Sequence, residues 1–129
     1  MKILAEISVG ELFDKITILN IKLKKINDPN KLKNIKIELD ALLEQSNKLI
    51  FKDDEILGKN IQKLQDINEE LWDIENAKRE CEANKEFGEI FIKISRDVHF
   101  KNDIRASIKK EINLLSNSKI TEEKEYSKY

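Results

Sequence analysis

The sequence has few residues that interrupt helices, and few that bind metals or form disulfides. Its 129 residues include three glycines, one proline, one cysteine and one histidine. A single cysteine, Cys81, excludes an internal disulfide and a cysteine-rich zinc site. The lone His99 does not favour a histidine metal site either. We therefore expect no bound metal and no other cofactor.

Long apolar runs are also missing. No stretch approaches the roughly 20 apolar residues of a membrane span. The opening MKILAEIS is similar to a signal peptide, but Glu6 and Glu11 interrupt the apolar region that such a peptide requires. We therefore expect a soluble, cytoplasmic chain with no membrane partner. The net charge of −1 does not favour nucleic-acid binding by the surface as a whole.

Charge is nevertheless uneven along the chain. Residues 15–36 hold seven lysines and one acid, a net charge of +6. Residues 66–89 hold nine acids and three basic residues, a net charge of −6. These segments are either complementary surfaces of one protein or one oligomer, or the basic segment is a docking face for an anionic partner.

The most abundant residue types are Lys, Glu, Ile and Leu, and this composition is typical of long helices. Ser8 and Glu11 have the spacing of a capping box, which predicts a helix from about Val9. The stretch NDPN at 27–30 ends that helix, and KDDE at 52–55 is expected to cap a third. Apolar residues recur every three or four positions in all four predicted helices.

The predicted fold is all-α: two antiparallel helical hairpins packed as a four-helix arrangement. Residues 1–115 form a single helical domain that starts with a short extended arm, and residues 116–129 form a disordered, flexible tail. The first helix is apolar on two sides, so it is central or lies at a subunit contact. The second hairpin is longer than the first. Its overhang predicts exposed apolar surface and therefore a homo-oligomer, most simply a dimer.

A turn near residue 85 determines which residues of the two helices in the second hairpin lie opposite each other. Residues whose numbers add to about 171 then lie side by side. This rule predicts that Asn68 lies beside Asp103, Trp72 beside His99, and Glu75 beside Arg96. The fourth helix is expected to turn Ile104 and Ile108 to the core, with Lys101 and Arg105 beside them. The candidate ligand-binding residues are Asp14, Asn68, Trp72, Glu75, Arg96, His99, Asn102, Asp103, Arg105 and Lys109.

Two interpretations of this set stay open. In the first, Glu75 pairs with Arg96, and Asp14 or Asp103 pairs with Arg105, as an internal network that fixes how the hairpins pack. In the second, Trp72 is the platform of a shallow pocket, and Arg96, Arg105 and Lys109 bind a small anion such as a phosphate, a carboxylate or a nucleotide sugar. No catalytic residue is assigned, because the chain has no Gly-rich phosphate loop, no G-x-S-x-G and no H-E-x-x-H.

Three stretches together resemble a bacterial family of small helical proteins that is known as a domain of unknown function: ISVGELFDKITILNIKLKKINDPNKLKNIKIEL, NEELWDIE and FIKISRDVHFKNDIRASIKKEIN. The resemblance covers about residues 3–115 and implies no activity. Asn20 stands where the family commonly has Glu, and His99 stands where it commonly has an aromatic residue, which weakens His99 as a catalytic base. The matching positions are Ser8, Glu11, Asp14, Lys15, Asn68, Trp72, Glu75, Arg96, Asn102, Asp103 and Arg105.

The leading hypothesis is a small self-associating helical protein that acts as a binding or scaffold module. The alternative is an enzyme or ligand-binding protein for an anionic metabolite. A scaffold should pair Arg96 and Arg105 and have no opening near Trp72. A ligand-binding protein should leave at least one of these arginines facing a cavity.

Overall fold

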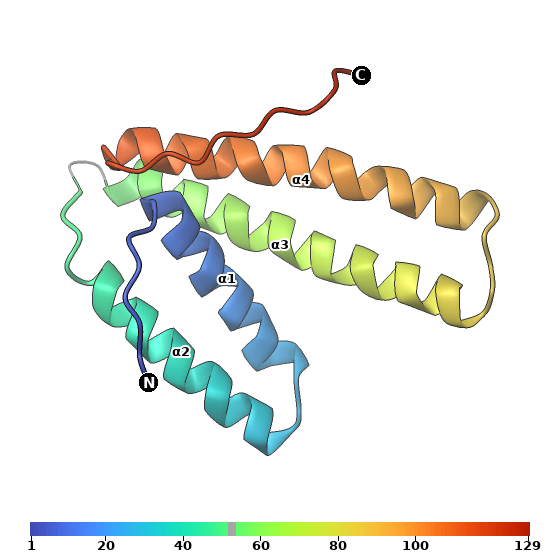
Figure 1. Ribbon diagram of the computed structural model, residues 1–129, viewed down its shortest axis with the longest axis horizontal. Helices are drawn as coiled ribbons and strands as arrows, with labels where there is room; N and C mark the ends of the chain where they lie inside the picture. The colour runs from blue at the N-terminus through green and yellow to red at the C-terminus, as the bar shows by residue number, and fades with distance from the viewer. Residues whose placement is uncertain (52–53) are drawn as a thin grey trace.

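Four helices make up the computed structural model, which describes residues 1–51 and 54–129. They are α1 (Val9–Lys25), α2 (Pro29–Ser46), α3 (Asp54–Ala83) and α4 (Glu89–Leu115). Figure 1 shows α1 with α2, and α3 with α4, as two antiparallel hairpins packed together. The predicted all-α, four-helix fold is confirmed for these residues, among which there is no strand. The cap predicted from 52–55 depends on residues that lie outside the described chain.

The helix ends follow the local sequence. Ser8 caps α1, and its Oγ accepts a hydrogen bond of 3.1 Å from the backbone N–H of Glu11. Asp28 caps α2, because its Oδ1 accepts hydrogen bonds from two backbone N–H groups of the first turn. Pro29 occupies the first helical position. After α3, Lys85 adopts a left-handed backbone conformation with φ of 54°, and Gly88 then caps α4. The predicted turn near residue 85 is therefore present.

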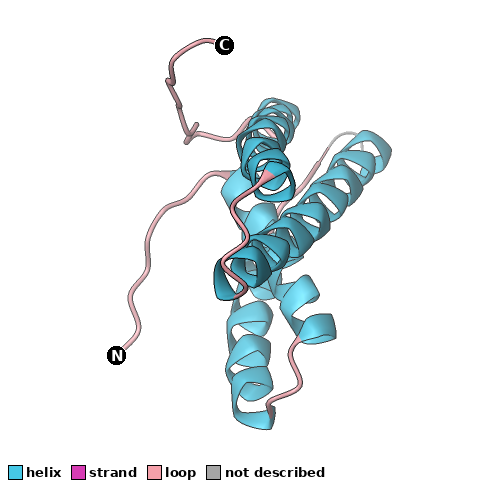
Figure 2. Ribbon diagram, turned by 90° about the vertical axis from the view of Figure 1, so that its right-hand side faces the viewer, coloured by secondary structure: helices cyan, strands magenta, loops and turns pink. Residues whose placement is uncertain are grey.

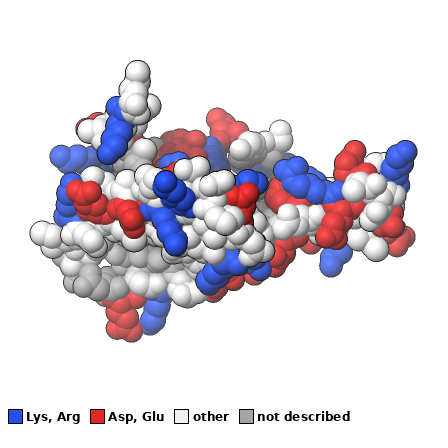
Figure 3. Space-filling view, turned by 90° about the horizontal axis from the view of Figure 1, so that it is seen from below, with Lys and Arg blue, Asp and Glu red and all other residues white. Residues whose placement is uncertain are grey.

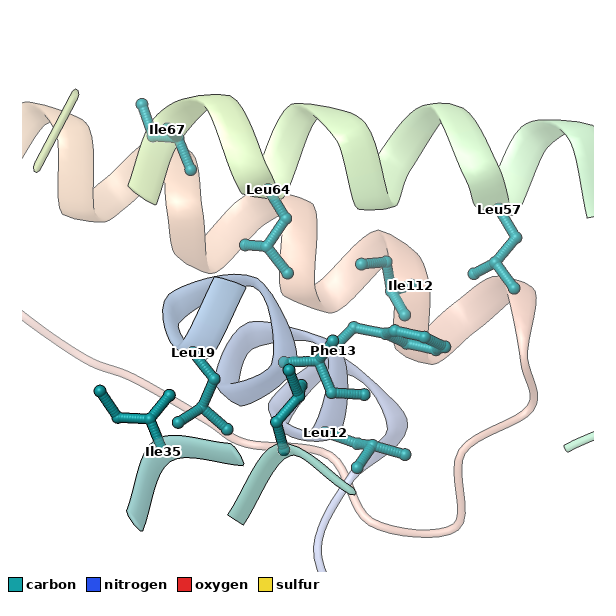
Figure 4. Packing of buried hydrophobic residues seen from close by; sticks show 10 residues of the cluster. Leu12, Phe13, Leu19, Ile35, Leu57, Leu64, Ile67 and Ile112 are labelled. Carbon is teal, nitrogen blue, oxygen red and sulfur yellow. The ribbon is translucent and has the colours of Figure 1, made fainter. Parts of the chain in front are cut away.

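The first helix is the centre of the fold. α1 packs against each of the other three helices, whereas α2, among the described residues, packs against α1 alone. In Figure 4, Leu57 and Leu64 of α3 point toward Phe13 of α1, and Ile35 of α2 lies against Leu19 on another side of α1. Burial on two sides explains why the apolar residues of α1 do not form one stripe.

The α3–α4 hairpin extends beyond the shorter hairpin, as Figure 1 shows. Figure 2, in which the end with the α3–α4 turn faces the viewer, shows helices and loops alone among the described residues. Its projecting end carries apolar side chains that α1 and α2 do not cover. Phe87, Ile90 and Ile92 are 52%, 67% and 55% exposed. The predicted overhang is thus present. None of the helices in the described ranges combines the length and the apolar character needed to cross a lipid bilayer.

The inward face of α4 differs from the sequence prediction. Ile104, expected in the core, is 47% exposed, whereas Lys109 is 6% exposed and Ile112 is fully buried. Ile108 does pack against the core, as predicted. The apolar periodicity of α4 was misleading because carboxylates on α1 and α3 face this helix. Cations on α4 therefore occupy positions that isoleucine would fill in an ordinary core.

The two ends of the chain behave differently. Residues 1–7 have no regular structure, and Ile3 and Leu4 in this arm are exposed. Residues 116–129 turn back and run along α4 (Figure 1). Ser118 accepts a hydrogen bond from the backbone N–H of Val9, and the Tyr129 hydroxyl donates one to Asp103. The flexibility of this segment stays a prediction, but its side chains contact both α1 and α4.

Gly10 allows the first turn of α1 to lie directly on α4. A Cβ atom at this position would be 2.5 Å from the carbonyl oxygen of Lys109 and 2.9 Å from Oδ1 of Asn113. The first of these atoms belongs to the backbone of a long helix, so displacing it would cost free energy. The Gly10 position therefore sets how closely α1 and α4 approach.

We expect Gly10→Ala to lower the free energy of unfolding by about 1–3 kcal/mol, as overpacking does. Gly58→Ala is the matched control, because a Cβ atom there meets nothing within 4 Å. Gly58 lies inside α3, so alanine should stabilise the helix by up to about 1 kcal/mol. Urea denaturation measures both variants. Equal stability changes would show that α1 and α4 do not approach this closely.

Candidate functional site

A buried carboxylate, Asp14 of α1, lies at the junction of three helices. Its side chain is only 2% exposed. Arg105 of α4 donates to both carboxylate oxygens, with 2.9 Å between Nε and Oδ1. Asn68 of α3 donates to Oδ1 at 2.9 Å, and Nζ of Lys109 lies 3.6 Å from Oδ2. Asp14 therefore joins α1 to both helices of the long hairpin.

These partners keep Asp14 ionised. Burial on its own would raise the pKa of the carboxyl group. The hydrogen bonds from Arg105 and Asn68, with the charges of Arg105 and Lys109, outweigh burial and hold the pKa of Asp14 below its ordinary value. The hydrogen bond to Asp14 in turn raises the pKa of Arg105. The pair is therefore a charge-assisted, two-point contact inside the fold.

Lys109 extends the network to both ends of the chain. Its Nζ lies 2.7 Å from a carboxylate oxygen of Glu11 and 2.8 Å from one of Glu122. Burial would lower the pKa of Lys109, but the hydrogen bonds to Glu11 and Glu122 outweigh it and raise that pKa. Lys109, in the C-terminal half of α4, therefore joins that helix to the first turn of α1 and to the C-terminal segment.

The beginning of α1 depends on the same face of α4. Asn113 accepts a hydrogen bond of 2.7 Å from the backbone N–H of Gly10. Ser118 accepts another of 3.1 Å from Val9. The first N–H groups of a helix have no acceptors inside the helix. Here side chains from distant parts of the chain act as the acceptors. The helix start and the tertiary contact are thus formed together.

The long hairpin has the predicted register. Lys101 of α4 forms an ion pair of 2.6 Å with Glu70 of α3, and their numbers add to 171. The hydrogen bond to Glu70 and its charge raise the pKa of Lys101. The two cations beside the apolar stripe of α4, Lys101 and Arg105, are therefore each met by a carboxylate from another helix.

A hollow of about 500 Å³ lies beside this network, between α1 and the long hairpin. Five of the predicted site residues line it: Asn68, Trp72, Glu75, Asn102 and Arg105. Its other lining residues, which were not among the candidates, are Ile18, Ile21, Leu71, Asn76 and Arg79. Helical spacing places Arg79 on the same face of α3 as Trp72, and Asn76, four positions after Trp72, could have been identified by the same spacing. Glu122 was also missed, because it lies in a segment expected to be disordered.

The remaining candidates lie elsewhere. The Arg96 guanidinium lies 5.9 Å from the centre of the Phe100 ring, in a separate depression. His99 packs edge-on against Tyr129 at a ring distance of 5.3 Å, and Asp103 accepts a hydrogen bond from the same tyrosine. Asp103 and His99 therefore contact the C-terminal segment rather than the Trp72 hollow.

The expected Glu75–Arg96 ion pair does not form among the described residues. Glu75 instead lies 4.0 Å from Arg79 of its own helix. The register was right, but residues that lie opposite each other in a hairpin form a contact only when their side chains point toward one another. Within the described ranges, no cluster of His, Cys, Asp and Glu is arranged to hold a metal ion.

We expect Arg105→Ala to lower the free energy of unfolding by about 3 kcal/mol or more, because it leaves the buried Asp14 without its main partner. Arg96→Ala is the matched control. Arg96 is exposed and has no ion pair within the described chain, so its loss should cost less than about 1 kcal/mol. Chemical denaturation of both variants distinguishes them, and equal losses would show that Arg105 has no special structural role.

The depressed pKa of Asp14 predicts a pH dependence of stability. The unfolded chain, with an ordinary pKa near 3.9, takes up a proton before the folded one, so this contribution is full above about pH 4 and is lost as the pH falls through the lower folded pKa. Wild type should therefore exceed Asp14→Asn in stability at pH 7, by a margin that shrinks below about pH 4. Urea titrations between pH 3 and pH 7 measure this margin. A margin that does not change with pH would contradict an ionised Asp14.

Comparison with known proteins agrees with the resemblance seen in the sequence. The profile of one protein family, described as "Family of unknown function (DUF6165)", matches residues 1–129. No curated protein and no solved structure matches the chain. The match spans every residue of the Asp14 network and of the hollow. The chain belongs to the Family of unknown function (DUF6165).

Proposed function

We propose that this chain is a helical binding or scaffold module that associates with a second copy of itself through the end of the α3–α4 hairpin. The observation that carries the proposal is the projecting end itself, with Phe87, Ile90 and Ile92 each more than half exposed. Phe87 and Phe91 pack edge to face there at a ring distance of 5.5 Å. Apolar side chains left uncovered at a projecting end are typical of an association site. A cytoplasmic location stays part of the proposal.

Charge complementarity favours a second copy as the partner. Of the acids between 66 and 89, Glu69, Glu70 and Glu75 form ion pairs inside the chain. Glu82 and Glu86, nearer the hairpin end, have no ion pair with any described residue, and both are exposed. Figure 3, seen from below, shows both acidic and basic side chains on this narrow projecting end; residues 80–89 hold four acids and one lysine, a net charge of −3.

The basic counterpart lies at the start of α2. Lys31 and Lys33 are exposed and have no ion pair with described residues. The acidic end and this basic corner belong to different parts of one copy. Two copies related by a twofold axis could place each hairpin end against the other copy's basic corner, which gives two identical contacts. Their attraction would steer the association and would weaken with salt.

The alternative, a protein for an anionic metabolite, has less support. Arg105, which lines the Trp72 hollow, is already matched by the buried carboxylate of Asp14. Arg96 is not part of the Trp72 hollow. An anion entering that hollow would meet no unmatched positive charge from these two residues.

A charge exchange tests the proposed contact. One variant carries Lys31→Glu and Lys33→Glu, and the other carries Glu82→Lys and Glu86→Lys. Each alone should be a monomer, because like charges then face each other in both contacts, whereas an equal mixture should form a heterodimer. Light scattering after size-exclusion chromatography gives the mass. A monomeric wild type, or variants that each remain dimeric, would refute this contact.

The apolar part of the contact has its own test. Ile90→Asp should convert the dimer to a monomer, because it places a charge in the proposed interface. Leu114→Asp is the matched control, since Leu114 is 65% exposed near the C-terminal end of α4, away from both the hairpin turn and the start of α2. The control should keep the mass of wild type. The same mass for both variants would place the contact elsewhere.

A further inference from the structure

The hollow beside Trp72 has the features of a small-molecule site. It combines one tryptophan, an apolar floor of Ile18, Ile21 and Leu71, and several amide side chains. Ligand sites are commonly concave and apolar, with a few polar groups that fix the orientation of the ligand. From this geometry we propose that the hollow binds an uncharged sugar ring, with Trp72 as the stacking surface.

Each arginine that lines the hollow lies beside a carboxylate, which disfavours the binding of an anion. Arg105 is paired with Asp14, and Arg79 lies 4.0 Å from Glu75. Both cations therefore have a carboxylate beside them before any ligand enters. A phosphate would compete with those carboxylates, whereas a neutral ligand would leave both pairs intact.

Hydrogen-bonding capacity is nevertheless left over. The Asn68 side chain is buried, and its Nδ2 donates to Asp14 and to Thr17. Its carbonyl oxygen accepts no hydrogen bond from any described residue. Arg105 uses three of its five N–H groups, on Asp14 and on Asn102, and no other described residue accepts a hydrogen bond from the remaining two.

Two further amides complete the polar lining. Asn76 makes no side-chain hydrogen bond with a described residue, and the Nδ2 of Asn102 makes none either. Amides both donate and accept, as hydroxyl groups do. The lining therefore offers donors and acceptors on several sides of one compact space, which matches a ring that carries hydroxyl groups around its edge.

The shape of the hollow distinguishes a sugar from a flat base. Trp72 is the only aromatic residue among the described residues that line the hollow, and the hollow is open to solvent. A nucleobase has two apolar faces, and one of them would stay in water here. A pyranose ring has one face of C–H groups that can lie on the indole, and its hydroxyl groups can face both the amides and the solvent.

Trp72 is the only tryptophan of the chain, so its fluorescence reports directly on the hollow. The probes are glucose, galactose and N-acetylglucosamine, compared with glucose 6-phosphate, inorganic phosphate and adenosine. At least one neutral sugar should give a saturable change, and glucose 6-phosphate should bind no tighter than glucose. The proposal is overturned if no sugar gives a saturable change, if inorganic phosphate or adenosine binds more tightly than every sugar, or if the phosphate ester binds tighter than glucose.

Asn76→Ala tests whether the amides hold the bound sugar. The variant should weaken sugar binding roughly five-fold, the effect of one lost hydrogen bond, and should keep the thermal stability of wild type. Asn34→Ala is the matched control, because Asn34 is exposed on α2 and does not line the hollow. Asn102→Ala gives a second test inside the hollow should Asn76→Ala lower stability. Wild-type affinity in both hollow variants would overturn the assignment.

Discussion

The structure depends on one constraint: a carboxylate buried among three helices must be matched by positive charge and by hydrogen bonds. Asp14 is almost inaccessible, and Arg105, Asn68 and Lys109 surround it. An unmatched charge there would cost several kcal/mol, because water would no longer solvate it. These contacts tie α1 to α3 through Asn68 and to α4 through Arg105 and Lys109. The network therefore contributes to the specificity of the fold, because it determines which faces of the helices pack together.

The same constraint shapes the two proposals on function. Because Asp14 neutralises Arg105, the adjoining hollow presents amides and a tryptophan without an unmatched positive charge from that residue. Because α1 is tied to the part of the hairpin around Arg105 and Lys109, the opposite end of that hairpin projects without cover. One polar junction thus leaves a recessed surface suited to a neutral ligand and a protruding surface suited to a second copy. The two surfaces are tested by different measurements.

Local signals predicted most of the fold. The capping box at Ser8, Pro29 at a helix start and the turn near residue 85 act over a few residues, and all three are present. The register of the long hairpin followed from the position of that turn, as the Lys101–Glu70 pair confirms. Periodicity alone failed at Ile104, because it shows that a helix has an apolar side but not what lies opposite.

The site was harder to predict because its contacts join distant residues. Asp14 and Arg105 are 91 positions apart, and the sequence left Asp14 and Asp103 as equal partners for this arginine. Asn76 lacked any signal stronger than its spacing, and Glu122 lies in a segment without apolar periodicity. A double-mutant cycle of Asp14→Asn and Arg105→Met tests the central claim most directly, through the free energies of unfolding of the four proteins. A coupling energy of at least about 1 kcal/mol is expected, and strictly additive effects would contradict the account.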